Sequence, residues 1–223
     1  GITIGSHIRA CAGIADSTLA SDEKILISQL EALSKKRFAV LDENAGQRMK
    51  EAIAAAAKDG DSVGGIIETA VAGLESGLGE PWFDSMESLL SHVIFSIPAV
   101  KGIQFGQGFD MASQRGSFTN DPFTVKDDRI ITVTNNNGGI NGGLTNGMPL
   151  LLSCAVKPTP SIYKKQQTAD FKTNENTELS LEGRHDPAIV HRAVAVVDSA
   201  VALVLYDVLI SRHGTDFFAD NVK

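Results

Sequence analysis

The sequence between Asp186 and about Arg212 constrains the fold more than any other segment, because it predicts one long helix that is apolar on nearly every face. Asp186 followed by Pro187 is a typical helix start, with an N-cap acid and a proline at the first helical position. At about 1.5 Å per residue this helix would be about 38 Å long. A helix that is apolar all round needs cover on several sides. We therefore predict that it forms the middle layer of an α+β sandwich, with sheets on both sides.

The remaining elements are a mixture of strands and helices. The predicted strands are residues 2–8, 63–72, 100–109, 149–156 and 178–181, and the predicted helices are residues 21–36, 42–58 and 85–97. Ser21 or Asp22 is expected to cap the first of these helices, and the pair Asp59-Gly60 to end the second. No linker or repeat divides the sequence, so we predict one domain over residues 1–223.

Two kinds of connecting segment are unusual. Gly64 and Gly65 lie in a β-branched run, where glycine is unfavourable unless another backbone or a ligand approaches closely. The polar segments 113–147 and 163–177 have little apolar periodicity beyond residues 130–133, so we expect loops there. Loops of this length inside a compact domain usually carry function.

Composition disfavours several classes of protein. The formal net charge of −7 and the pI near 5.2 argue against a general nucleic-acid-binding protein, which would have a basic face. Cys11 and Cys154 lie in apolar segments and are predicted to be reduced core residues. Charged residues interrupt the long apolar segment, which argues against a membrane-spanning helix. The first residues also lack the basic segment followed by an apolar segment that is typical of a secretory leader. We therefore expect a soluble cytoplasmic protein with neither a membrane nor nucleic acid as its partner.

Three loops carry the candidate functional residues, at positions 138–147, 157–161 and 183–187. The first is rich in glycine, which exposes backbone N–H groups to a ligand. The second reads Lys-Pro-Thr-Pro-Ser and adds the cation of Lys157 and two hydroxyl groups. The third contains Arg184, whose planar guanidinium suits a carboxylate or a phosphate, just before the predicted helix N-terminus. Together the three loops predict an anion-binding site.

Each of these signals also has a purely structural interpretation. Glycine-rich loops are often only turns, Asp186 can act only as an N-cap, and Lys157 can be a solvated loop lysine. The five histidines lack metal-ligand spacing, and the sequence has no Walker loop, paired-cysteine motif, His-Glu-x-x-His or nucleophile elbow. His7 and His92 are therefore expected to be structural, and no metal site is predicted.

Taken together, ordered blocks of the sequence resemble chorismate synthase. Residues 61–68 read Asp-Ser-Val-Gly-Gly-Ile-Ile-Glu, residues 77–84 read Gly-Leu-Gly-Glu-Pro-Trp-Phe-Asp, and residues 96–102 read Ser-Ile-Pro-Ala-Val-Lys-Gly. Further matching blocks are residues 106–109, 115–117, 120–121, 138–147, 157–162 and 183–187. The blocks follow the order of the family over most of the chain, and so many ordered matches are more specific than any single motif.

The resemblance implies a carbon–oxygen lyase of the shikimate pathway, in aromatic amino acid biosynthesis. Chorismate synthase converts 5-enolpyruvylshikimate 3-phosphate to chorismate by anti-1,4-elimination of phosphate with loss of a C6 hydrogen. The reaction requires reduced FMN although it is redox-neutral overall. The family fold is a β-α-β sandwich assembled as a homotetramer, which agrees with the central helix predicted above.

Matching blocks imply roles for individual residues. The expected FMN contacts are Pro98, Ala99, Gly142, Lys157, Pro158, Thr159, Pro160, Ser161 and Arg184. Asp186 matches the family aspartate near flavin N5 that is proposed to help move the proton, and Arg184 matches an arginine near both flavin and substrate. Many relatives have asparagine at the position of Pro98, so a backbone contact is expected there. A carboxylate beside a reduced flavin can be tuned for proton transfer.

The family blocks that carry its two catalytic histidines and its substrate-binding arginine pair have no counterpart in this sequence. The resemblance therefore implies the C-terminal part of a chorismate synthase, which we expect to lack turnover by itself. Two alternatives stay open. One is a non-catalytic structural or oligomerisation core without bound flavin, and the other is an unrelated phosphate-binding enzyme.

Overall fold

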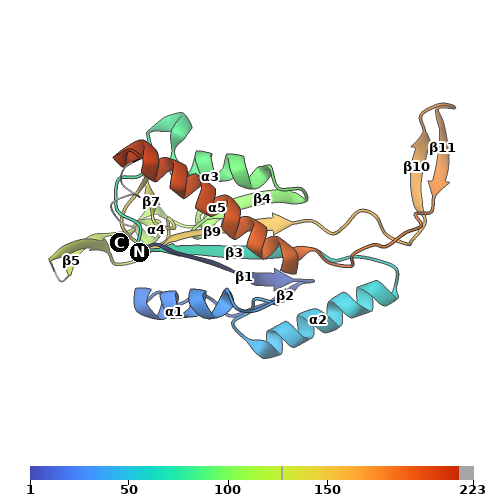
Figure 1. Cartoon of the computed structure of the whole chain (residues 1–223), viewed down its shortest axis with the longest axis horizontal. Coiled ribbons are helices and arrows are strands. Elements are labelled where there is room, and N and C mark those ends of the chain that lie inside the picture. The colour runs from blue at the N-terminus through green and yellow to red at the C-terminus, as the bar shows by residue number, and fades with distance from the viewer. Residues whose placement is uncertain (127, 216–223) are drawn as a thin grey trace.

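The computed structural model describes residues 1–126 and 128–215. Its centre is a five-stranded antiparallel sheet with the strand order β2-β1-β3-β9-β4 (Figure 1). The strands are β1 (Thr3–Cys11), β2 (Ile14–Ala15), β3 (Gly65–Ala72), β9 (Leu150–Val156) and β4 (Val100–Phe105). The middle strand β3 pairs with β1 on one side and with β9 on the other, so residues far apart in the sequence meet in the sheet.

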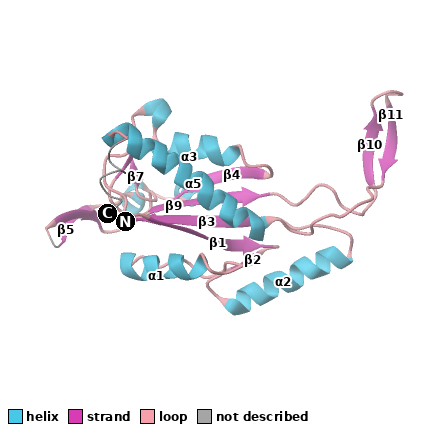
Figure 2. Cartoon of the chain, in the orientation of Figure 1, coloured by secondary structure: helices cyan, strands magenta, loops and turns pink. Residues whose placement is uncertain are grey.

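Helices cover both faces of this sheet (Figure 2). The helices are α1 (Glu23–Leu33), α2 (Glu43–Lys58), α3 (Met86–Phe95) and α5 (Val190–His213). Neighbouring residues of β1 identify the faces: a Cβ added to Gly5 would lie 3.0 Å from the Cβ of Leu30 in α1, whereas Ser6 donates a hydrogen bond to Asp198 in α5. Because successive strand residues point to opposite faces, α1 and α5 lie on opposite sides of the sheet.

The first three helices begin at the capping residues that their sequences predict. Asp22 accepts hydrogen bonds from the N–H groups of Lys24 and Ile25, at 3.0 and 3.1 Å, at the start of α1. Asp42 caps α2 and Ser85 caps α3 in the same way. These side chains satisfy N–H groups that have no partner inside the helix. The predictions of these three helices are confirmed, with ends shifted by a few residues.

The predicted start of the last helix is wrong. Helix α5 begins at Val190, and its N-cap residue, Ile189, contributes no side-chain hydrogen bond. Asp186 and Pro187 lie in the segment before the helix. This segment is held instead by β3, because the N–H of Val63, just before that strand, donates to the carbonyl of Pro187 at 2.8 Å. Arg184 is therefore separated from the N-terminus of α5 by a short irregular segment.

Helix α5 has the large sheet on one side and solvent on the other within the described residues. It packs on β1, β3 and α3, and its inward residues include Val197 and Val201, both fully buried. On its outer face Val196, Leu203 and Tyr206 are 50%, 66% and 52% exposed. The predicted mixed α+β class is confirmed, but within the described residues no second sheet covers the outer face of α5, contrary to the predicted central position of this helix.

Among the described helices, only α5 is long and apolar enough to cross a membrane, judged by length and composition alone. The charged residues that interrupt its sequence do not prevent this, contrary to our expectation. However, 44% of its most apolar window is buried inside the fold. A core helix of a globular protein passes the same test, so this feature is weak support for a membrane protein.

Both polar segments that we predicted to be loops contain small hairpins. Strands β5 (Phe123–Lys126) and β6 (Arg129–Thr132) pair in the first, and β10 (Gln166–Asp170) pairs with β11 (Glu175–Leu179) across the second. The first segment also holds the short helix α4 (Gly116–Thr119) and the two-residue strands β7 (Ile140–Asn141) and β8 (Leu144–Thr145). The strand predicted at residues 178–181 overlaps only the end of β11. The other strands of these segments were missed because exposure of nearly all residues in β5, β10 and β11 leaves no apolar alternation to detect.

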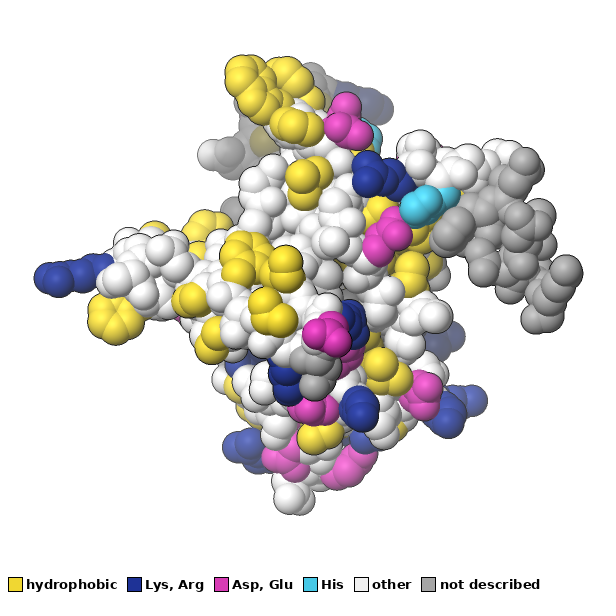
Figure 3. Space-filling view, turned by 90° about the vertical axis from the view of Figure 1, so that its left-hand side faces the viewer, with side chains coloured by type: hydrophobic (Ala, Val, Ile, Leu, Met, Phe, Trp, Pro, Cys, Tyr) yellow, Lys and Arg dark blue, Asp and Glu magenta, His cyan; other side chains and the backbone are white. Residues whose placement is uncertain are grey.

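The two long hairpins project from the body of the molecule at opposite ends (Figure 1). Several hydrophobic residues are exposed in and around β5 and β6, namely Phe118, Phe123, Val125, Ile130 and Val133. Figure 3 views the molecule from that end and shows hydrophobic side chains on this surface.

The hydrophobic core lies on both faces of the large sheet. It includes Ile8, Leu30, Ile67 and Leu152, each with at most 1% exposure. Cys11 and Cys154 are buried and free, as predicted. Burial raises the pKa of the Cys154 thiol to about 11, so this side chain behaves as an apolar core residue.

Candidate functional site

The 157–161 loop leaves the end of β9 beside the connection between α3 and β4. The N–H of Lys157 donates to the carbonyl of Ala99 at 2.9 Å, so two of the predicted flavin-binding segments are adjacent. Ala99 has φ of +74°, a left-handed conformation that is uncommon for a residue with a side chain. Strained backbone of this kind often occurs at ligand-binding sites.

The 183–187 segment lies against the first loop. The hydroxyl of Tyr163 donates to the carbonyl of Gly183 at 2.6 Å. The ring of Tyr163 also meets the ring of His185 edge-on, with centroids 4.8 Å apart. Residues of both segments line one small cavity of about 40 Å³, among them Ser161 and Asp186. The fold therefore brings Lys157, Ser161 and the 184–186 residues to the same end of the sheet.

Asp186 is paired with a cation in this arrangement. It forms an ion pair with Arg192 in the first turn of α5. The hydrogen bond from Arg192 holds the pKa of Asp186 below its usual value, and the charges of Arg192, Arg184 and His191 act in the same direction. Burial, together with the charge of Arg192, lowers the pKa of His191. At neutral pH Asp186 is therefore an ionised carboxylate that can accept a proton.

The groups of this region that have no partner suit an anionic ligand. Lys157 and Arg184 are exposed, and neither forms an ion pair with a carboxylate among the described residues. The hydroxyl oxygen of Thr159 is buried and has no hydrogen-bond partner in the described part of the chain. A buried hydroxyl without a partner calls for a ligand or a water molecule. Two exposed cations and a partnerless hydroxyl on two adjacent segments fit a phosphate or carboxylate group.

Gly142 lies apart from the other candidate residues. It has φ of +61° in the turn between β7 and β8, and its neighbour Gly143 accepts a hydrogen bond of 2.9 Å from the N–H of Met86 at the start of α3. The loop that holds Gly142 contacts the start of β9, where the N–H of Leu151 donates to the carbonyl of Gly138. Lys157 follows the other end of β9, and the strand is about 20 Å long at about 3.3 Å per residue. Within one chain, the fold does not bring Gly142 to the site formed by Lys157 and Arg184.

The chain is similar to known proteins over nearly its whole length. Residues 1–210 match the protein family described as chorismate synthase. The chain belongs to the chorismate synthase family. It is 46% identical over 207 residues to the chorismate synthase of Methanosarcina acetivorans, covering 93% of this chain and 55% of that protein. It is 50% identical over 171 residues to that of Thermococcus gammatolerans, covering 77% of this chain and 48% of that protein.

A solved structure supports the same assignment. A crystal structure of chorismate synthase superposes with a TM-score of 0.80 at 26% sequence identity, covering 98% of this chain and 60% of the other. The chain spans about half the length of the curated relatives it matches. The mixed fold with an antiparallel sheet is thus the fold of the corresponding part of a chorismate synthase.

Sequence reasoning missed several residues of this candidate site. Arg192 pairs with Asp186, and Tyr163 joins the two loops. The 59–64 turn, at the end of α2, supports the 157–161 loop, because the hydroxyl of Ser62 donates to the carbonyl of Thr159 at 2.7 Å. In the sequence, Gly64 was the residue that indicated a close contact at this turn. A Cβ added there would lie 2.5 Å from the carbonyl oxygen of Val156, so the close backbone approach indicated by the sequence is confirmed.

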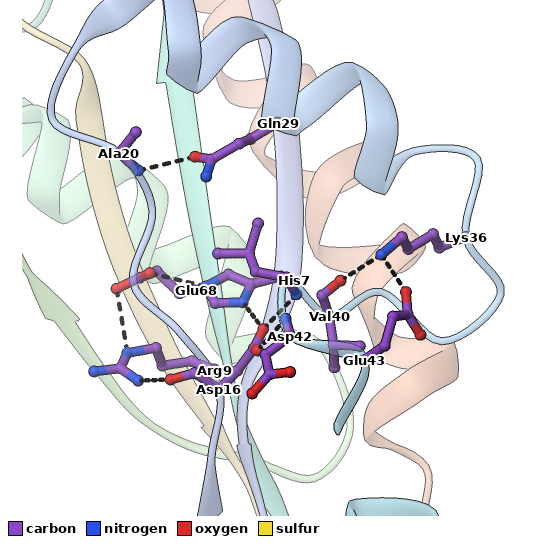
Figure 4. Close-up of polar contacts among 11 residues, drawn as sticks. His7, Arg9, Asp16, Ala20, Gln29, Lys36, Val40, Asp42, Glu43 and Glu68 are labelled. Atoms are coloured by element: carbon purple, nitrogen blue, oxygen red, sulfur yellow. Dashed lines mark hydrogen bonds and ion pairs between the residues drawn. The ribbon is translucent and has the colours of Figure 1, made fainter. Parts of the chain in front are cut away.

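A second polar cluster lies inside the fold, around His7 in β1 (Figure 4). Its ring nitrogens contact carboxylate oxygens of Asp16 at 2.8 Å and of Glu68 at 2.9 Å. Asp16 also accepts hydrogen bonds from the N–H groups of Leu41 and Asp42, at 2.7 and 2.8 Å. The side chains of His7 and Asp16 are fully buried. The prediction that His7 is structural is therefore confirmed.

Hydrogen bonding keeps the buried carboxylate of Asp16 ionised. Burial by itself raises its pKa, but the hydrogen bonds from Leu41, Asp42 and His7 together outweigh burial, and the pKa lies below its usual value. This cluster joins β1, the β2 turn and the start of α2. Its groups are already satisfied, so nothing in it calls for a ligand.

Proposed function

We propose that this chain forms the flavin-binding part of a chorismate synthase. In this proposal it binds reduced FMN beside 5-enolpyruvylshikimate 3-phosphate, from which the whole enzyme eliminates phosphate to give chorismate. The observation that carries the proposal is that the 157–163 loop, which holds the partnerless hydroxyl of Thr159, contacts both Ala99 and the 183–187 segment at one end of the sheet. Family membership supports the same reaction.

Each residue has a role that follows from its chemistry. Lys157 and Arg184 are free cations that would bind the phosphate of FMN and the anionic groups of the substrate. Thr159 and Ser161 offer hydroxyl groups, while Pro158 and Pro160 restrict the backbone of the loop. Pro98 and Ala99 would contact the flavin through their backbone.

Asp186 is the proposed proton-transferring group. Its carboxylate is ionised beside Arg192, so it can take up the proton that leaves the substrate and later release it. Reduced FMN, when bound, supplies a transient electron that helps the phosphate to leave. The protein residues orient both molecules and hold the proton at the Asp186 carboxylate.

The experiment is a titration of the chain with reduced FMN. We expect Lys157→Met and Arg184→Met each to weaken FMN binding at least about tenfold, because each removes hydrogen bonds to an ionised group. Lys165→Met is the matched control, since Lys165 pairs with Glu178 on the β10–β11 hairpin at 3.4 Å. Equal affinities for all three variants would contradict the proposed site.

A turnover assay tests the expectation for the isolated chain. With reduced FMN and 5-enolpyruvylshikimate 3-phosphate, we expect a full-length relative to form chorismate and this chain to form none. Measurable chorismate from this chain would show that the assigned residues suffice. Absence of any flavin binding would favour the alternative of a non-catalytic structural or oligomerisation core.

We infer three further properties from the family resemblance and the composition. The chain forms a single domain, and the whole enzyme is a cytoplasmic homotetramer. Two free buried cysteines agree with a reducing compartment. Gly142 would contact FMN bound beside Lys157 only if it came from another copy of the chain in that tetramer. Sedimentation measurements on the full enzyme test the tetramer.

A further inference from the structure

The turn formed by residues 59–64, between α2 and β3, contacts both candidate loops. The sequence marked this turn as the end of a helix, as the site of a pair of glycines and as part of a block that resembles chorismate synthase, without assigning it a role. In the fold it lies between the 157–164 segment and the 183–187 segment, which do not otherwise share a strand or a helix. Its contacts to each segment are direct hydrogen bonds.

Three contacts join the turn to the 157–164 segment. The hydroxyl of Ser62 donates to the carbonyl of Thr159 at 2.7 Å. The N–H of Tyr163 donates to the carbonyl of Gly60 at 3.0 Å. The ammonium of Lys164 donates to Asp61 at 2.9 Å and also to Asp59. The loop is therefore fixed to the turn on both sides of Ser161.

The same turn reaches the 183–187 segment. The N–H of Val63 donates to the carbonyl of Pro187 at 2.8 Å. Gly60 and Asp61 line the cavity of about 40 Å³ together with Ser161, His185 and other residues of the two segments. One short turn thus holds both segments, and the direct contacts of Tyr163 with Gly183 and His185 complete the junction.

Glycine is required where the turn meets the loop. A Cβ added to Gly64 would lie 2.5 Å from the carbonyl oxygen of Val156 and 3.0 Å from the ring of Pro158. Such short distances do not occur for real Cβ atoms, so any side chain at position 64 would push the loop away. The close approach is what brings the hydroxyl of Ser62 within hydrogen-bond distance of Thr159.

We propose that the 59–64 turn fixes the two loops relative to each other, and that Ser62 is a positioning residue for the site through Thr159. Ser62 binds the carbonyl of the same residue whose own hydroxyl is buried without a partner. The hydrogen bond from Ser62 therefore fixes the backbone of the residue that carries this free hydroxyl. The inference rests on the proposed flavin site for its effect on binding, but the positioning itself is independent of the ligand.

The first test compares Ser62→Ala with Ser62→Thr in the whole chain. Loss of one neutral hydrogen bond should weaken binding of reduced FMN about fivefold in Ser62→Ala, and Ser62→Thr should restore it because it keeps the hydroxyl. Ser34→Ala is the matched control. It removes a serine-to-carbonyl hydrogen bond of 2.9 Å, to Glu31 at the end of α1, in a helix that contacts neither loop.

Amide hydrogen exchange without flavin is the second readout. Ser62→Ala should speed exchange in both the 157–163 and 183–187 segments and leave β1 unchanged, whereas Ser34→Ala should change neither segment. Unchanged exchange in both segments would overturn the inference, whether or not FMN binds. If the unaltered chain binds no FMN, the proposed function fails, and faster exchange in both loops would still support the positioning by the turn.

A second pair of variants guards against poor folding of Ser62→Ala. Lys164→Met removes the ion pairs to Asp59 and Asp61, and Lys165→Met removes only the exposed pair to Glu178. Exposed ion pairs contribute little, so we expect about twofold faster exchange in the 157–163 segment for Lys164→Met alone. Equal exchange rates of the 157–163 segment in Lys164→Met and Lys165→Met would contradict the proposal that the turn supports this loop.

Discussion

Two polar regions of this chain differ in how completely their groups are satisfied. Around His7, every ring nitrogen and the carboxylate of Asp16 have partners inside the fold, and both side chains are fully buried. At the end of the sheet, Lys157 and Arg184 are exposed without ion pairs among the described residues, and the hydroxyl of Thr159 is buried without a partner. Groups that hold a fold together are paired within it. The partnerless groups are therefore the ones available for a ligand.

The largest effect predicted by this comparison is the loss of Asp16. Asp16→Ala removes the hydrogen-bond acceptor of the buried His7 ring and of the partly buried N–H groups of Leu41 and Asp42. We expect the free energy of unfolding to fall by about 3 kcal/mol, because each buried donor without an acceptor costs about 1–3 kcal/mol. Urea unfolding monitored by circular dichroism measures the change.

Glu43→Ala is the control for that prediction. Glu43 pairs with Lys36 at 2.6 Å, but its side chain is 72% exposed, so the expected loss is at most about 1 kcal/mol. If both variants lost the same stability, burial and full hydrogen bonding would not distinguish the His7 cluster from the surface, and the comparison would fail.

The comparison also explains what the sequence could predict. Helix starts at Asp22, Asp42 and Ser85 follow from local capping chemistry, so they could be placed. The strand β3 could be placed too, because its β-branched run is strongly apolar. The start of α5 could not be placed, because Asp186 and Pro187 are typical of a helix start. Only the tertiary contact of Pro187 with Val63 shows that these residues lie before the helix.

The site was only partly predictable for a similar reason. Lys157, Arg184 and Asp186 belong to recognisable sequence blocks, and the fold brings them to one end of the sheet. The pairing of Asp186 with Arg192 and the hydrogen bond from Ser62 to Thr159 join residues that no local pattern connects. Gly142 stays a prediction, because a matching block does not tell whether a residue reaches the site of its own chain or that of another copy.

Asp198 is intermediate between the two regions, because it is partly buried and has one hydrogen-bond partner. Its replacement is expected to change stability less than Asp16→Ala. It lies on α5 facing β1, accepts a hydrogen bond from Ser6, and has a pKa raised by burial. A raised pKa in the folded state means that its stabilising contribution is complete below the unfolded value of about 4 and is lost as the pH rises through the folded value.

Asp198→Asn should therefore raise stability at pH 7, because asparagine keeps an acceptor for Ser6 and never ionises. The gain in urea midpoint over the unaltered chain should shrink as the pH falls toward about 4. Asp207→Asn, at an exposed position of the same helix, should show no such trend. A gain that stays constant with pH would rule out ionisation of Asp198 as its cause.

The smallest stability effect is expected at the site itself, and it is the sharpest test of the comparison. Lys157→Met and Arg184→Met remove exposed cations that hold no partner among the described residues, so the free energy of unfolding without ligand should change by at most about 0.5 kcal/mol. A clear loss of stability without flavin would mean that these cations serve the fold, as Asp16 does. A loss of FMN binding at unchanged stability is the result that only a ligand site produces, because the same side chains would then matter to the ligand and not to the folded chain.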